Sequence, residues 1–81
     1  MMKIPIELTG ESRDLLMRHF KEGTVLHEVL KGARRKELAD VAVYSFECEA
    51  AEAENLLAMA HDHCPPAVKD IEHAIFAATA G

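Results

Sequence analysis

Two short segments of this sequence have the pattern of β-strands, and they lie far apart in the chain. In Lys3–Leu8, every second residue is isoleucine or leucine, which is the period of a strand with one buried face. Pro5 cannot donate a ladder hydrogen bond, so this strand is expected at a sheet edge. Val41–Glu47 has β-branched and aromatic residues on both faces, which predicts a central strand covered on two sides. Two strands alone make a marginal sheet.

The remaining segments have helical periodicity. Thr9 is a candidate N-cap for the first helix, and Gly23 supplies a left-handed stop after it. Val25–Leu30 is ambiguous: its apolar spacing fits a helical face, which we favour, but it is short and β-branched enough for a strand. A further helix ends near His63, and Pro65 with the following proline opens the last one.

This pattern predicts a small single α+β domain over residues 1–81, with the order β-α-α-β-α-α. Two strands pack against helices, or three if Val25–Leu30 is a strand. We prefer the arrangement in which dimerisation completes the sheet with a second copy of the chain. With 81 residues the core is thin, which also favours self-association.

Composition limits the cellular setting that we expect. No stretch approaches the roughly 18 apolar residues that cross a bilayer, and the N-terminal residues 1–5 lack the apolar run of a secretory signal. Cys48 and Cys64 are too few for a disulfide framework. We therefore expect a cytoplasmic protein with free thiols and without a membrane partner.

The charge is distributed unevenly along the chain. Residues 1–40 carry eight Lys/Arg and seven Asp/Glu, whereas residues 41–81 carry Lys69 alone against seven acids. An acidic surface repels phosphate backbones and attracts a basic partner. The expected partner-binding residues on this acidic helix face are Glu47, Glu49, Glu52 and Glu54, with Phe76 as an exposed apolar group.

The segment Lys31–Lys36, "KGARRK", is the one concentrated positive patch. Such a run could contact phosphates, which makes a nucleic-acid-binding regulator an alternative function. The whole chain has a net charge of -5 and no aromatic residues interleaved with this patch, so nucleic acid is not the expected partner. We expect a solvated helix end that could face the acidic helix of another copy. Its candidate residues are Lys31, Arg34, Arg35 and Lys36.

The stretch "HDHC" contains the only candidate metal ligands by spacing, His61 and Cys64. They lie three residues apart and could share a helical face, but Cys64 precedes a proline that biases it away from helical geometry. Zinc needs three or four ligands. A metal-binding protein is thus a further alternative, and the preferred interpretation is a polar helix end beside a small buried cysteine.

No pattern in the chain identifies catalytic chemistry. The glycines stand isolated, so there is no glycine-rich phosphate loop. A pairing of Cys48 with one of five histidines depends entirely on the fold. We expect neither catalytic nor cofactor-binding residues, and the sequence favours a protein–protein interaction or regulatory module over an enzyme.

Overall fold

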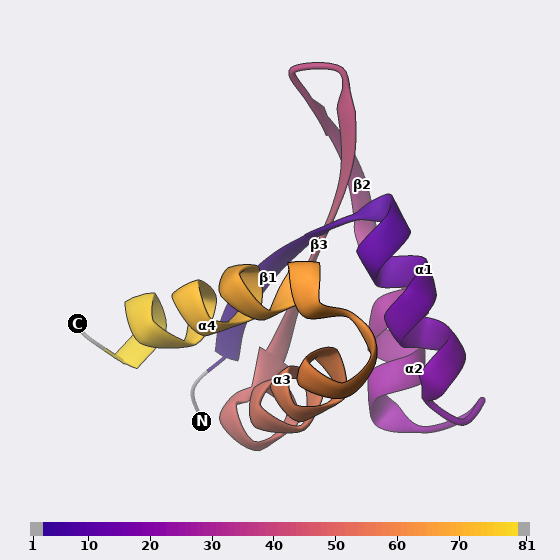
Figure 1. Cartoon of the computed structure of the whole chain (residues 1–81), viewed down its shortest axis with the longest axis vertical. Coiled ribbons are helices and arrows are strands. Elements are labelled where there is room, and N and C mark those ends of the chain that lie inside the picture. The colour runs from indigo at the N-terminus through magenta and orange to yellow at the C-terminus, as the bar shows by residue number, and fades with distance from the viewer. Residues whose placement is uncertain (1–2, 80–81) are drawn as a thin grey trace.

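The computed structural model describes residues 3–79, which form an α+β domain around a three-stranded antiparallel sheet (Figure 1). The elements are β1 (Lys3–Thr9), α1 (Gly10–His19), α2 (Val25–Lys31), β2 (Arg34–Leu38), β3 (Val41–Glu49), α3 (Ala50–His63) and α4 (Pro65–Thr79). The strand order is β1-β3-β2, so the predictions of a central β3 and an edge position for β1 are confirmed. The ends of the expected domain, residues 1–2 and 80–81, lie outside this description.

The third strand comes from a segment that we expected to be a helix end. Val25–Lys31 is helical, as favoured. The third strand is β2, which follows this helix and pairs with β3 through a two-residue turn. That turn, Ala39 and Asp40, has φ of 50° and 68°, which suits the twist of a hairpin although neither residue is glycine. The predicted order is therefore wrong by one strand, and the observed order is β-α-α-β-β-α-α.

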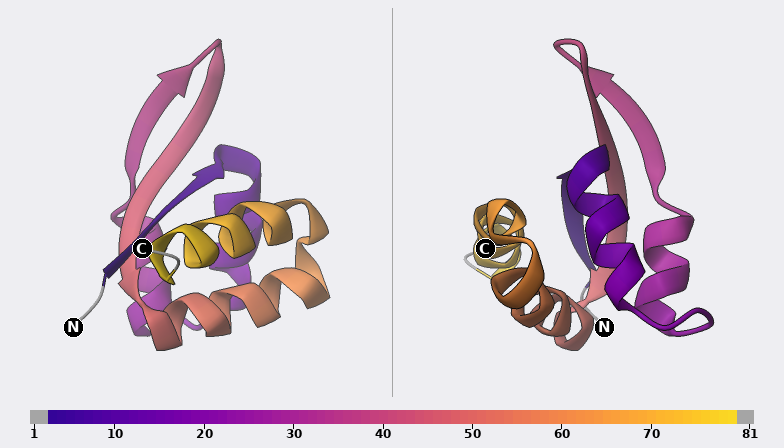
Figure 2. Two further views of the ribbon diagram at one scale, coloured as in Figure 1. Left: turned by 90° about the vertical axis from the view of Figure 1, so that its left-hand side faces the viewer. Right: turned by 45° about the vertical axis from the view of Figure 1, so that its right-hand side comes forward.

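The core lies on one face of the sheet, where the helices pack (Figure 2). Register places Ile4, Ile6 and Leu8 of β1 beside Cys48, Phe46 and Tyr44 of β3, respectively. The three β1 side chains are at most 1% exposed. All four described helices bury residues in this cluster, including Leu16, Leu30, Leu56 and Ile71.

The other face of the sheet, here called the open face, is not covered by a layer of helices (Figure 2). Strand alternation and register place these residues on it: Lys3, Pro5, Glu7, Arg34, Lys36, Leu38, Val41, Val43, Ser45 and Glu47. The β2–β3 hairpin extends beyond the helices at one end of the molecule (Figure 1). Leu38 is 55% exposed and Val41 is 50% exposed. The expectation that β3 is covered on two sides is therefore wrong, because half of this strand belongs to a protruding hairpin.

The helix ends follow from local signals in the sequence. Thr9 caps α1 by accepting a hydrogen bond from the Ser12 backbone N–H at 3.3 Å, as predicted. Glu49 and Glu52 form a capping box at the start of α3. The α3 helix ends at His63, and the two prolines lie in the first turn of α4. Within residues 3–79, no helix has the length and apolar character to cross a membrane.

The buried thiol of Cys48 makes the stability of the fold sensitive to pH in the alkaline range. Burial, helped by the nearby Glu52 carboxylate and opposed by Lys3, raises the pKa of the Cys48 thiol from 9.0 to about 11. Between these values the folded state keeps a proton that the unfolded chain loses. We therefore predict that the free energy of unfolding falls as the pH rises through this window.

Urea denaturation at several pH values from about 8 to about 11 measures this effect. The matched control is Cys48→Ala, which lacks the thiol but shares every other titrating group. The stability of the control should fall less steeply with pH. Equal slopes for the two chains would contradict the role assigned to Cys48.

Candidate functional site

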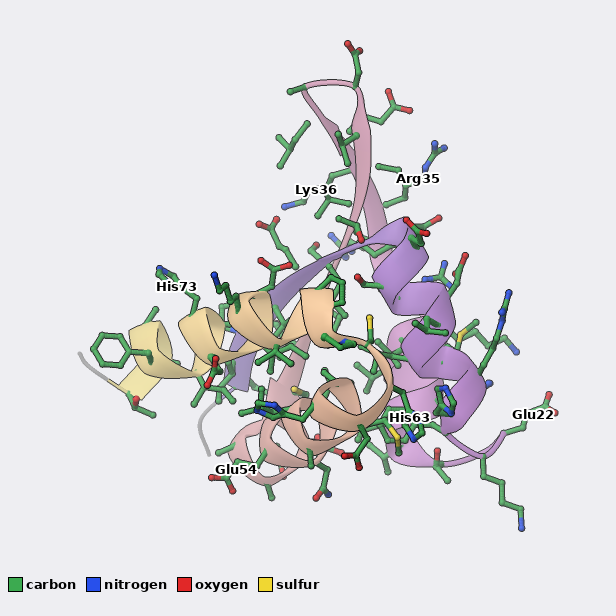
Figure 3. The ribbon with its side chains drawn as sticks, viewed as in Figure 1. Glu22, Arg35, Lys36, Glu54, His63 and His73 are labelled. Carbon is green, nitrogen blue, oxygen red and sulfur yellow. The ribbon has the colours of Figure 1, made fainter. Side chains whose placement is uncertain are left out.

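The four glutamates expected on one acidic helix face have separate positions. Glu49 and Glu52 contact each other at the start of α3, where the Glu52 Oε1 accepts a hydrogen bond from the Glu49 backbone N–H at 3.1 Å. Glu47 lies on the open face opposite Pro5 of β1. Glu54 is exposed on α3 and points away from the body of the molecule (Figure 3). Only Glu52 and Glu54 lie within α3, so the four residues do not form a face of one helix.

A groove between α3 and the connection from α1 to α2, here called the α3 groove, combines apolar and acidic residues. Its volume is about 480 Å³. It is lined by Phe20, Thr24, Val25, Leu26, Glu52, Asn55, Ala58, Met59 and Asp62. Val25 is 62% exposed, so apolar surface in this groove is accessible.

The two charged residues that line the α3 groove are both acids. Glu52 and Asp62 lie on the same helix and are ten residues apart, a separation of about 15 Å along the helix axis. Met59 and Ala58 lie between them. Glu52 was expected as a partner-binding residue, whereas Asp62 and Val25 were not. The only signal of Val25 in the sequence is its position just after the Thr24 N-cap.

A second groove, on the open face, contains charges of both signs. It has a volume of about 720 Å³ and lies between α2 and all three strands of the sheet. Its charged residues are Lys3, Glu7, Glu28, Arg34, Lys36 and Glu47. The Lys36 Nζ lies 3.7 Å from a carboxylate oxygen of Glu7. This groove therefore has no single sign of charge.

The expected basic patch is divided between two elements. Lys31 ends α2, whereas Arg34, Arg35 and Lys36 lie on β2, so the expectation of one solvated helix end is wrong. Strand alternation sends Arg35 and Lys36 to opposite sides of the hairpin (Figure 3). Arg35 pairs with Glu37 at 3.4 Å, and Lys36 contacts Glu7. Two of the four cations thus already have carboxylate neighbours.

The "HDHC" stretch forms the junction of α3 and α4. Cys64 is 2% exposed, and its backbone N–H donates to the Ala60 carbonyl at 2.8 Å, whereas His61 is exposed. His63 instead stacks on His19 of α1, with ring centroids 3.8 Å apart and an interplanar angle of 14°. Among residues 3–79, no three His, Cys, Asp or Glu side chains gather as metal ligands do.

Phe76 was also expected to belong to the interaction surface. It is 71% exposed on α4, so its side chain is accessible. It lines neither the α3 groove nor the groove on the open face. A single exposed apolar side chain is common on protein surfaces and defines no site by itself.

We predict that zinc does not stabilise this fold. Cys64 is enclosed by packing and His61 is exposed, so the pair cannot supply the closed coordination of a structural zinc site. Thermal unfolding with and without equimolar zinc should give melting temperatures that agree within about 2 °C. A larger rise with zinc that disappears in His61→Ala would contradict this prediction.

Comparison with models of protein families, with curated proteins and with solved structures found no match for this chain.

Proposed function

We propose that this protein is a protein–protein interaction module, and that it binds a short segment of a partner that is both apolar and basic. The observation that carries this proposal is the α3 groove, in which accessible apolar side chains lie between two acids. Acidic residues at the rim attract a basic segment and orient it, while burial of apolar side chains supplies most of the affinity. The binding surface is thus more restricted than the whole acidic half of the chain.

The dimensions of the α3 groove indicate the form of the bound segment. Basic side chains about 15 Å apart would reach Glu52 and Asp62 together, with apolar anchors between them. An amphipathic helix supplies such anchors at positions i, i+3, i+4 and i+7. Met59 suits this role because its flexible side chain adapts to differently shaped anchors. A volume of about 480 Å³ accepts a few side chains, which favours reversible, regulatory binding.

The proposed module acts as a homodimer in a reducing compartment. We infer a homodimer of single domains over residues 1–81, which would present two α3 grooves to partners. Both cysteines are buried free thiols, which supports action in a reducing compartment such as the cytoplasm.

The nucleic-acid alternative would use the protruding β2–β3 hairpin, because a two-stranded ribbon can enter a DNA groove. The exposed cations on β2 support it. Against it, Arg35 and Lys36 have carboxylate neighbours, and the net charge of the chain is -5. Protein binding at the α3 groove is therefore the better supported function.

Selection of peptides from a random phage-displayed library against the full chain tests the proposal. We predict that selected peptides combine apolar residues with Arg or Lys, and that a labelled one binds less tightly as salt increases. Asp62→Lys should weaken its affinity about tenfold, because the variant places a cation at the acidic rim. Fluorescence anisotropy measures the dissociation constant.

Glu54→Lys is the matched control. It makes the same charge reversal on the same helix at an exposed position outside the groove. It should change the affinity less than about twofold. Recovery of acidic peptides, or equal losses in the two variants, would show that the α3 groove does not bind basic segments.

A further inference from the structure

We propose that the open face is the interface of the homodimer, and that its two-fold axis runs along β3. This inference specifies the dimer in the proposed function and does not depend on what occupies the α3 groove. Three arrangements on the open face support a second copy of the chain as its occupant.

The first arrangement is a row of opposite charges across the sheet. Ser45 of β3 pairs with Arg34 of β2 on one side and with Glu7 of β1 on the other. The cation and the anion thus lie at the same level on opposite edges of the open face. A two-fold axis along β3 exchanges the edges, so Arg34 of each copy faces Glu7 of the other. An isologous interface requires this kind of self-complementary pattern.

The second arrangement concerns α2, which borders the open face beside the part of β3 that β2 does not reach. Glu28 and Val29 of α2 line the same groove as Lys3 and Pro5 of β1. The two-fold axis places α2 of one copy over β1 of the other. Glu28 and Val29 of one copy then lie over the strand of the other copy that carries Lys3 and Pro5 on the open face.

The third arrangement is the apolar end of the open face. Leu38 and Val41 are directly paired at the tip of the hairpin, and Val43 follows on the same face. No other described element covers the two exposed side chains. The proposed axis brings the valines of the two copies into contact. This contact stabilises a hairpin that would otherwise be marginal in water.

Size and charge limit the strength of this dimer. The three strands, of seven, five and nine residues, span a face of about 330 Å². A stable interface of standard size buries about 800 Å² on each partner. Glu47 also lies on β3 close to the axis, where it faces the same carboxylate of the other copy. We therefore expect a concentration-dependent dimer, and Glu47→Gln should tighten it.

Sedimentation velocity of the full chain from about 1 µM to about 1 mM tests the proposal. The expected result is a monomer–dimer equilibrium that Val41→Lys weakens at least tenfold. Val25→Lys is the matched control, because it makes the same change at another exposed valine, in the α3 groove. It should leave dimerisation unchanged. A strict monomer at the highest concentration would overturn the proposal, as would dimerisation that depends on Val25 instead of Val41.

A charge exchange tests the direction of the axis. Arg34→Glu and Glu7→Arg should each weaken the dimer, and the double variant should recover at least part of the affinity, because each new arginine again faces a glutamate. Additive losses would exclude this axis. Circular dichroism checks that each variant is folded. Peptide binding by Val41→Lys separates the two proposals, since a functional α3 groove should survive when the open face is disrupted.

Discussion

The antiparallel pairing of β1 with β3 is the contact on which the rest of the molecule depends. It joins the beginning of the chain to its middle and aligns Ile4, Ile6 and Leu8 with Cys48, Phe46 and Tyr44 on a single face. A register shift of one residue would turn this apolar set toward solvent. Because the helices gather on that face, the polar residues of both strands are left together on the other. The core and the open face are thus two results of one pairing.

Sequence patterns predicted the parts of the fold that depend on local chemistry. Alternation identified β1, and Thr9 and the two prolines marked the beginnings of helices. Gly23, with a φ of 92°, was expected to end the first helix, but it lies in the turn after α1, which ends at His19. The strand β2 was missed because all five of its residues are exposed and four are charged, so no apolar period identifies it. Its turn also lacks the Asn-Gly or Asp-Gly pair that usually signals a hairpin.

The site was harder to predict because it depends on which elements become neighbours. Four glutamates that are close in sequence suggested one acidic helix face, but Glu47 lies on β3, Glu49 caps α3 and only Glu52 and Glu54 lie within α3. The α3 groove arises only when Val25, after α1, comes beside Met59 of α3. Spacing along one helix can suggest the distance from Glu52 to Asp62, but it cannot reveal the apolar wall contributed by another segment.

The two edges of the sheet have a consequence for how copies of this protein can accumulate. One edge strand contains a proline, and the other consists largely of Arg, Lys and Glu. Both features discourage the addition of further strands. At high protein concentration these edges therefore oppose the edge-to-edge strand pairing that leads to fibrils. Association through the open face, in contrast, stops at a dimer, because the two copies cover each other's face.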